Sequence, residues 1–245
     1  MLKLIRQLAV LSALTSYSFF IGTSSVKAQN PNPDPDPMPV CPASGTVANL
    51  LATTACRGTP SRYEIIIYEM GLCTADPLGS GTFVRTTCTA TFTSSGTTTD
   101  LAGGASVSLG SSGSRPADGS YSHAYIVMGN TFGLSGEYEL SAGSLAGTYR
   151  SNSIGTAVLN GPLTNFTETL NNFDPGNTCD PIVSDTVGGG TLTAAVADTT
   201  LVTASSCTGV SRIVASFAPS SSIVIDSAAT GLKVTFSVTD NGMTV

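Results

Sequence analysis

The sequence contains no tryptophan, one histidine and few charged residues, which make up 11% of its 245 positions. Without tryptophan, the chain lacks the aromatic side chain that usually stacks on a bound sugar ring. A single histidine offers one candidate for the commonest general base, and it cannot complete a Cys/His metal cluster. These absences disfavour a glycosidase, a serine hydrolase with a histidine base and a structural zinc site.

Leu, Lys and Glu are also scarce, whereas Thr and Ser are abundant and the chain contains 26 glycines. Strands and turns favour these abundant residue types, and helical bundles and coiled coils require the scarce ones, so both helical classes are excluded. Hydrophobic residues still make up 41% of the chain, which is enough apolar surface to drive collapse. The composition therefore predicts a folded all-β protein.

The first 28 residues have the pattern of a secretory signal peptide. Lys3 and Arg6 precede an apolar stretch over residues 8–21 that is too short to span a bilayer, and the tripeptide ending at Ala28 fits a signal peptidase. We expect cleavage after Ala28, with a retained N-terminal anchor as the alternative. The mature chain is then secreted to the extracellular space or cell surface, or to the periplasm, and no membrane span is expected in it.

Cleavage makes the mature chain strongly acidic, because it removes three basic residues and no acidic one. Seven basic residues remain against 16 acidic residues, which gives a net charge of −9. Such a surface repels phosphate backbones and anionic lipid head groups. Nucleic acid and the membrane surface are therefore not expected as partners.

All six cysteines lie in the part of the chain that we expect to be exported, where an oxidising compartment favours disulfides. There is no Cys-x-x-Cys motif of the kind that redox and zinc sites use. Six cysteines allow 15 connectivities, and the spacing favours pairing between neighbours along the chain. The expected disulfides are Cys41–Cys56, Cys73–Cys88 and Cys179–Cys207.

Short segments rich in β-branched and aromatic residues recur along the mature chain, with turn residues between them. Residues 62–73 give the strongest signal, and we expect them to form a central strand in a hairpin with residues 83–92. Residues 232–239 show the cleanest alternation, and residues 47–55 are the one helix candidate. Other strands are expected at 106–109, 120–128, 132–140, 148–152, 156–159, 191–197, 201–204, 210–217 and 222–225. The pattern predicts an antiparallel β-sandwich, or two small sandwich subdomains in tandem, stapled by disulfides.

The chain divides into four segments. Residues 1–28 form the signal peptide, and residues 29–40 form an extended spacer, because alternating prolines favour polyproline II. A dense cluster of turn residues at 171–177 divides the cysteines four before and two after. We therefore expect a β-rich domain over residues 41–172 and a β-rich C-terminal subdomain over residues 173–245.

Few residues could carry catalysis. His123 lies in an expected strand, and no acid at a recognisable spacing orients it, so we interpret it as structural. Glu64 and Glu69, or Glu137 and Glu139, could form a carboxylate pair like that of a glycosidase. The second pair shares one strand face, however, and the sugar-stacking tryptophan is absent. We expect no catalytic residue and no enzyme.

Asp174, Asn177 and Asp180 offer oxygen ligands in a glycine-containing loop, as a calcium site requires. They match no established spacing for such a loop, so we interpret them as caps of their own turns. No metal site and no cofactor is expected.

The sequence is typical of building blocks of extracellular structures. We expect a secreted, non-catalytic structural or cell-surface protein, such as a filament, surface-layer or adhesion subunit, whose partners are other copies of itself or cell-surface components. A monomeric secreted β-sandwich that binds a glycan or protein is the alternative, and a secreted hydrolase is the third candidate. The last expected strand, residues 232–239, can close its own sheet or pair with a neighbouring subunit. Its apolar face carries Leu232, Val234, Phe236 and Val238.

Overall fold

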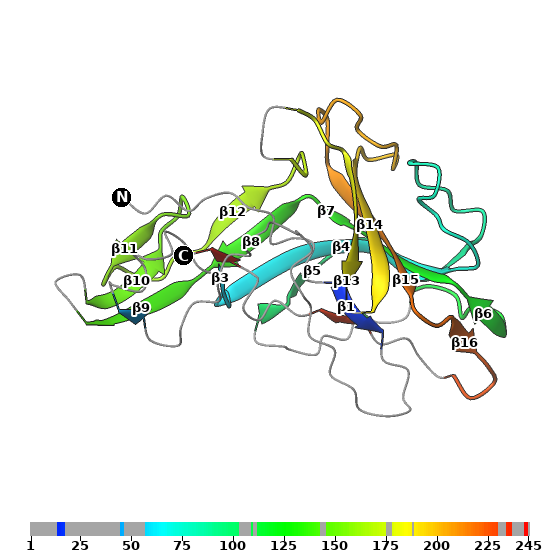
Figure 1. The fold of residues 1–245 in the computed structure, drawn as a ribbon, viewed down its shortest axis with the longest axis horizontal. Coiled ribbons are helices and arrows are strands. Elements are labelled where there is room, and N and C mark those ends of the chain that lie inside the picture. Colours follow the sequence, from blue (N-terminus) through cyan, green and yellow to red (C-terminus); the bar gives the residue numbers. More distant parts are fainter. Residues whose placement is uncertain are drawn as a thin grey trace.

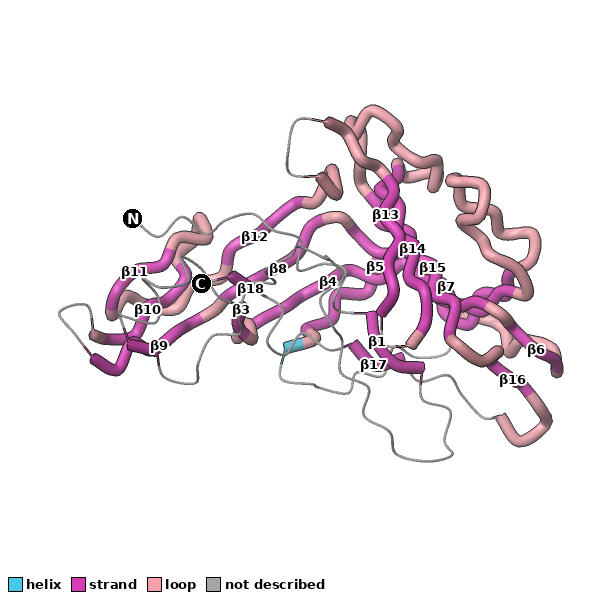
Figure 2. The backbone as a smooth tube through the Cα atoms, in the orientation of Figure 1, coloured by secondary structure: helices cyan, strands magenta, loops and turns pink. Residues whose placement is uncertain are grey.

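The computed structural model describes residues 14–17, 45–46, 57–102, 109, 112–142, 146–174, 178–187, 189–229, 234–236 and 243–244. The fold of these residues is all-β, as predicted, and the strands pair antiparallel with a single parallel exception (Figures 1 and 2). The predicted helix at residues 47–55, the strand at 106–109 except for residue 109, and the disulfide Cys41–Cys56 lie outside the described residues.

The structure contains 18 strands in the described residues. They are β1 (Leu14–Tyr17), β2 (Gly45–Thr46), β3 (Arg57–Gly58), β4 (Arg62–Cys73), β5 (Cys88–Asp100), β6 (Gly119–Tyr121), β7 (His123–Gly129), β8 (Thr131–Ser135), β9 (Glu137–Ala142), β10 (Gly147–Ser151), β11 (Ala157–Leu159), β12 (Phe166–Thr169), β13 (Ile182–Val187), β14 (Gly190–Ala197), β15 (Arg212–Pro219), β16 (Ile223–Ile225), β17 (Val234–Phe236) and β18 (Met243–Thr244).

The main sheet is built around β4, which has the bounds predicted for the central strand. Its strand order is β12-β8-β4-β7-β15-β14-β13, and β5 pairs with β4 along the opposite edge. β7 pairs with the C-terminal half of β4, with Cys73 opposite His123, and β8 pairs with the N-terminal end, with Arg62 opposite Ser135. Because β15 adds to β7 and β12 adds to β8, the sheet divides in two where β7 meets β8 (Figure 1).

Asn130 occupies this division point, between the end of β7 and the start of β8. Its buried amide nitrogen Nδ2 lies 3.2 Å from the carbonyl oxygen of Leu170, 3.0 Å from Oδ1 of Asn171 and 3.2 Å from the carbonyl oxygen of Val210. The backbone nitrogen of Leu170 in turn donates to the carbonyl of Asn130 at 2.8 Å. One side chain therefore joins the end of β12 to the segment that leads into β15.

The main core lies on one face of this sheet and draws on both sides of the domain boundary predicted at residue 173. β15, from beyond that boundary, also pairs with β7 from before it, so the sheet is continuous across the boundary. The buried members of the core are Tyr63, Ile65, Ile67, Met70, Phe92, Leu101, Ile126, Met128, Phe132, Phe173, Leu192, Ala194, Val196, Ile213, Ala215 and Phe217.

The opposite face of the sheet carries a smaller core beneath two loops. Leu78 and Phe83 come from the loop between β4 and β5, and Leu201 comes from the loop that follows β14. Beyond β8, the chain continues as β9 into a separate sheet of order β11-β10-β9-β2. A sandwich of two facing sheets stays a prediction, because the described strands form one large sheet with smaller sheets around it.

The hairpin partner of β4 differs from the prediction. β5 begins at Cys88 instead of residue 83 and continues to Asp100, well past the predicted end. Residues 83–87 lie in the loop, where the Phe83 ring packs 5.2 Å from the Tyr125 ring. Of this segment only Phe83 covers the smaller core, and residues 84–87 are exposed. Residues 201–204 were also expected as a strand, but they form a turn with a single bridge between Ala197 and Thr203.

Two of the three expected disulfides are confirmed. Cys73–Cys88 joins directly opposed residues of β4 and β5, and Cys179–Cys207 joins the segment before β13 to the loop after β14. No cysteine in the described part of the chain is free. Each bridge removes unfolded-state entropy worth about 3 kcal/mol in the chain-entropy model, and both are typical of an oxidising compartment.

Gly71 offers a test of the packing around β4. A Cβ atom at this position would lie 2.2 Å from the carbonyl oxygen of Thr89 and 2.6 Å from the Tyr125 ring, whereas at Gly129 the nearest atom would be 3.5 Å away. We expect Gly71→Ala to lower the free energy of unfolding by about 1–3 kcal/mol, because backbone must move, and Gly129→Ala to change it by less than about 0.5 kcal/mol. Urea unfolding of both variants measures this, and equal midpoints would contradict the packing described.

Candidate functional site

The structure places His123 beside a serine, in an arrangement unlike that of an activated nucleophile. Oγ of Ser122 lies 2.8 Å from Nδ1 of His123 and donates its proton to the carbonyl oxygen of Thr74 at 3.0 Å. With the serine proton directed to the backbone, the hydrogen bond to His123 requires the tautomer that carries its proton on Nδ1. In that tautomer Nδ1 donates to the serine oxygen and does not take its proton, as a general base would.

Three of the four glutamates considered as carboxylate pairs form ion pairs with arginines. Glu64 forms an ion pair with Arg62, and Glu69 forms one with Arg85. Glu137 lies 3.0 Å from Nε of Arg150, on the neighbouring strand. Three of the four carboxylates are thus each held by a separate arginine.

Glu69 also anchors a cluster on the face of the sheet that carries the smaller core. The Tyr125 hydroxyl donates to Oε1 of Glu69 at 2.6 Å, and Arg85 contacts both carboxylate oxygens at 3.1 and 2.5 Å. Burial, and then the hydrogen bond to Glu69, raises the pKa of Tyr125 far above its usual value. Burial likewise raises the pKa of Tyr63, in the main core. The cluster holds the loop between β4 and β5 against the sheet.

These two phenols predict how stability depends on pH. Above about pH 10, the unfolded chain loses both protons while the folded protein keeps them, so the free energy of unfolding falls as the pH rises. Each phenol contributes about 1.4 kcal/mol per pH unit. Urea unfolding between pH 9 and 11 measures this slope. Tyr125→Phe should make the slope shallower, and an unchanged slope would show that this hydroxyl titrates normally in the folded state.

The loop considered for calcium is organised by a residue that the sequence did not single out. Oδ1 of Asn172 accepts hydrogen bonds from the backbone nitrogens of Asp174 and Asp180, at 3.1 and 2.8 Å, and Nδ2 donates to the carbonyl of Thr178. Asn177 lies outside the described residues. In the described part of the chain, no three His, Cys, Asp or Glu side chains gather as a metal site would require.

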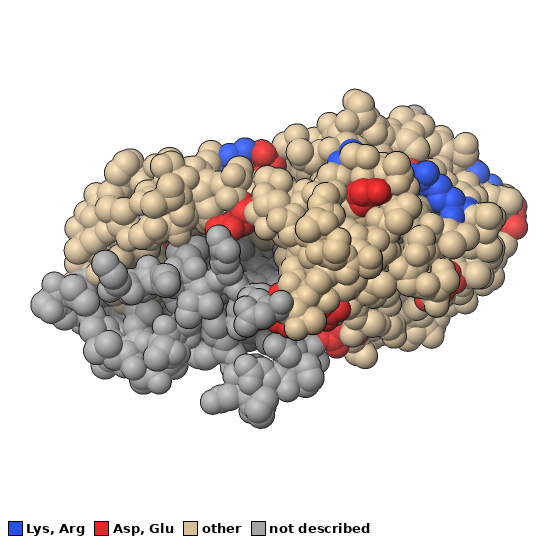
Figure 3. Space-filling view, turned by 90° about the horizontal axis from the view of Figure 1, so that it is seen from above, with Lys and Arg blue, Asp and Glu red and all other residues tan. Residues whose placement is uncertain are grey.

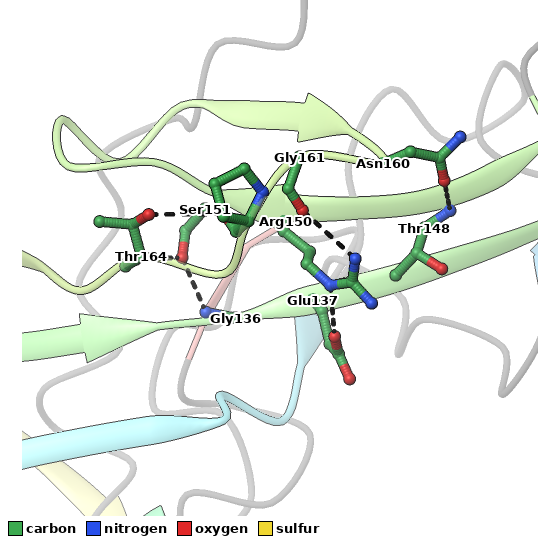
Figure 4. Close-up of polar contacts among 9 residues, drawn as sticks. Gly136, Glu137, Thr148, Arg150, Ser151, Asn160, Gly161 and Thr164 are labelled. Atoms are coloured by element: carbon green, nitrogen blue, oxygen red, sulfur yellow. Dashed lines mark hydrogen bonds and ion pairs between the residues drawn. The ribbon is translucent and has the colours of Figure 1, made fainter.

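The sheet of β9, β10 and β11 projects from the main sheet toward one end of the longest axis, and we call residues 136–164 the arm (Figure 1). Figure 4 shows the polar contacts that stiffen it. Arg150 of β10 binds Glu137 of β9 and donates to the carbonyl oxygen of Gly161 at 3.2 Å. Oγ of Ser151 accepts from the backbone nitrogen of Gly136 at 3.1 Å and donates to the carbonyl of Thr164 at 2.8 Å.

The turn between β10 and β11, at the base of the arm beside β12, presents a large apolar side chain. Ile154 is 78% exposed, and its backbone nitrogen donates to Oδ1 of Asn152 at 3.0 Å. The nitrogen of Thr156 donates to the same oxygen. Gly155 adopts a φ of +71°, and a Cβ there would lie 2.9 Å from the Phe166 ring, so the turn requires glycine. Ile154 is therefore exposed by a rigid turn and not by a flexible loop.

Exposed apolar side chains concentrate on the arm. Seven large hydrophobic residues are exposed in the described part of the chain, and four of them lie within ten residues around β11, the edge strand of the arm. These four, which we call the arm patch, are Ile154, Val158, Leu159 and Leu163. Because Val158 and Leu159 are consecutive in β11, their side chains point to opposite faces, so the four exposed residues flank the edge strand on both faces.

Two further exposed residues lie on the paired loops at the opposite half of the molecule. Val84 belongs to the loop between β4 and β5, and Val202 belongs to the loop after β14; we call them the loop patch. Oγ1 of Thr203 donates to the carbonyl oxygen of Gly81 at 2.7 Å and joins the two loops. In Figure 1 the loop after β14 lies at the top of the view and the loop between β4 and β5 at its upper right, both away from the arm.

Val202 is also presented by a rigid turn. Oδ1 of Asp198 accepts hydrogen bonds from the backbone nitrogens of Thr200 and Val202, at 2.8 and 3.1 Å, and from the Thr200 hydroxyl at 2.7 Å. These bonds, chiefly the one from the hydroxyl, lower the pKa of the Asp198 carboxyl. The turn after β14 and the turn between β10 and β11 thus share one feature, an Asx side chain that caps the turn of an exposed aliphatic residue.

Comparison with known proteins gave no family model, no curated protein and no solved structure that matches this chain. The interpretation of the site therefore depends on the geometry and chemistry of its own residues. No helix in the described residues has the length and apolar character needed to cross a membrane. Figure 3 shows charged side chains scattered over one face in small groups, with wide uncharged areas between them.

The expected pairing strand at the C-terminus is described only in part. β17 covers Val234–Phe236, and Val234 packs against the main core. β17 pairs with β1, which lies within the predicted signal peptide. Leu232 and Val238 are outside the described residues, so pairing with another subunit stays a prediction.

Proposed function

We propose that this protein is a secreted, non-catalytic structural subunit of an extracellular or cell-surface assembly, and that it associates with copies of itself. The observation that carries the proposal is the arm patch, where four large apolar side chains surround the edge strand of a rigid projection. A monomer would expose this surface to water at a cost of roughly 25 cal/mol per Å² of apolar area. Association removes that cost.

The structure of the arm supports an assembly role because its order exists before any contact forms. The ion pair of Arg150 with Glu137, and the hydrogen bonds of Ser151, fix the relation between β9, β10 and the segment after β11. A rigid surface loses little conformational entropy on binding, so more of the apolar contact energy contributes to affinity. The disulfides and the export signal suit a protein that works outside the cell.

The first test is the state of association of the protein purified after export. We expect its sedimentation coefficient to rise with concentration, and to rise further when sodium chloride increases from about 0.02 M to 0.5 M. Salt screens the repulsion between chains of net charge −9 and leaves apolar contacts intact.

A single monomeric species at every concentration and salt level would contradict the proposal. That result would favour the monomeric binding module, in which the arm meets a glycan or a different protein. Association that weakens as salt rises would also contradict it, because the contact would then depend on opposite charges instead of apolar surface.

A further inference from the structure

We infer that Cys179–Cys207 is an exchangeable disulfide, which an external dithiol opens in the folded protein while Cys73–Cys88 stays intact. The inference goes beyond the proposed function, because it applies to a monomer and to an assembly alike. Exchange begins when a thiolate attacks one sulfur of a disulfide and the other sulfur leaves as a thiolate. The reactivity of each bridge therefore depends on solvent access to the attacked sulfur and on the stability of the leaving thiolate.

The Cys73–Cys88 bridge is protected by burial. Cys73 is 0% exposed and lies in the smaller core together with Leu78 and Tyr125. An attacking thiolate can therefore reach only Cys88, which is half-buried. The sulfur of Cys73 would then have to leave as an anion in apolar surroundings. Such surroundings destabilise a thiolate, so Cys73 is a poor leaving group.

The sheet also holds the two sulfurs of this bridge together. Cys73 and Cys88 are directly opposed in the β4–β5 ladder, and the backbone nitrogen of Thr74 donates to the carbonyl oxygen of Thr87 at 2.9 Å. If Cys88 formed a mixed disulfide, the sulfur of Cys73 would remain beside it at a high effective concentration. The ladder therefore favours return to the original bridge.

The Cys179–Cys207 bridge has a different environment. Both cysteines are half-buried, so either sulfur is open to attack and either can leave as a solvated thiolate. Cys207 stands between exposed residues, at 205–206 and 208–209. It also has a φ of +54°, a left-handed conformation that is unfavourable for a residue with a side chain. Opening the bridge removes one constraint that holds this conformation.

The two sulfurs of this bridge can separate once it opens. The backbone nitrogens of Ser205 and Cys207 donate to carbonyl groups of the same loop, whereas Cys179 lies in the segment that Asn172 organises. β14 and β15 remain joined by their own ladder, over Gly190–Ala197 and Arg212–Pro219. Opening is therefore a local event that leaves the main sheet paired.

Complete opening consumes one dithiol. Its first thiolate attacks one sulfur, the disulfide bond breaks, and the electron pair of that bond goes to the leaving sulfur, which takes up a proton. The second sulfur of the dithiol then attacks the mixed disulfide and releases the other cysteine, which is also protonated. The bridge is thus reduced to two thiols, and the dithiol is oxidised to a disulfide.

The test is a time course of reduction of the exported protein by dithiothreitol without denaturant. Iodoacetamide blocks free thiols at each time, and mass spectrometry of proteolytic peptides measures the blocked fraction of each cysteine. We expect Cys179 and Cys207 to become blocked at least about tenfold faster than Cys73 and Cys88. The far-UV circular dichroism spectrum should stay native while the first pair reacts, because the sheet remains paired.

Leu78→Ala tests whether burial protects Cys73–Cys88. Leu78 is 3% exposed and shares the smaller core with Cys73, so its truncation should speed reduction of Cys73–Cys88 and leave the rate at Cys179–Cys207 unchanged. Val84→Ala is the matched control in the same loop, because Val84 is 42% exposed. This control should change neither rate. If Leu78→Ala is not exported, Phe83→Ala replaces it, since Phe83 packs against the same core.

Three results would overturn the inference. Equal rates at the two bridges, or a faster reaction at Cys73–Cys88, would show that burial and the ladder give no protection. Loss of the native spectrum in step with reduction of Cys179–Cys207 would show that this bridge opens only when the protein unfolds. Equal acceleration of both bridges by Leu78→Ala would show that overall stability, and not local burial, sets their rates.

Discussion

A single buried carboxamide, that of Asn130, holds the point at which the main sheet divides. β5 pairs along one edge of β4, whereas β7 and β8 share the other edge in succession. The contacts of Asn130 with Leu170, Asn171 and Val210 fix the two branches to each other at this point. Losing the carboxamide would remove its hydrogen bonds to the carbonyl groups of the half-buried residues Leu170 and Val210, each worth about 0.5–1.5 kcal/mol. The direction of the arm relative to the loop end depends on this joint.

The branch point at Asn130 also determines how the arm is positioned. The arm extends from β9, which continues the β7–β8 path beyond Gly136, while the loop after β14 extends from the other branch. A fixed branch point holds the arm in one position relative to the main sheet, so every subunit presents the arm patch in the same way.

The sequence predicted the features that depend on local pattern. Its β-branched and aromatic run identified β4 with the correct bounds, and spacing along the chain identified Cys73–Cys88 and Cys179–Cys207. The start of β5 was wrong because Phe83 has the composition of a strand residue but packs under a loop against Tyr125. β12 went unrecognised, since a short polar stretch such as Phe166–Thr169 becomes a strand only through the partners it meets. β13 was also missed, although it begins with the β-branched residues Ile182 and Val183.

The exposed apolar residues of the candidate site were not predicted from the sequence. Ile154 and Val202 stand in turn-rich stretches, and nothing in the local pattern distinguishes an exposed aliphatic residue from a buried one. A signal did exist in the Asn and Asp residues two and four positions before these residues, because Asx caps produce ordered turns. The carboxamides of Asn130 and Asn172 were missed for a related reason. The role of Asn130 is set by backbone groups distant in the sequence, at residues 170 and 210, and that of Asn172 by backbone groups two to eight residues further along its loop.

The central claim is that copies of this protein associate, and small-angle X-ray scattering of the exported protein over a concentration series tests it most directly. The account predicts that the forward scattering per unit mass rises with concentration. Scattering that stays at the value of a monomer at every concentration would contradict the account.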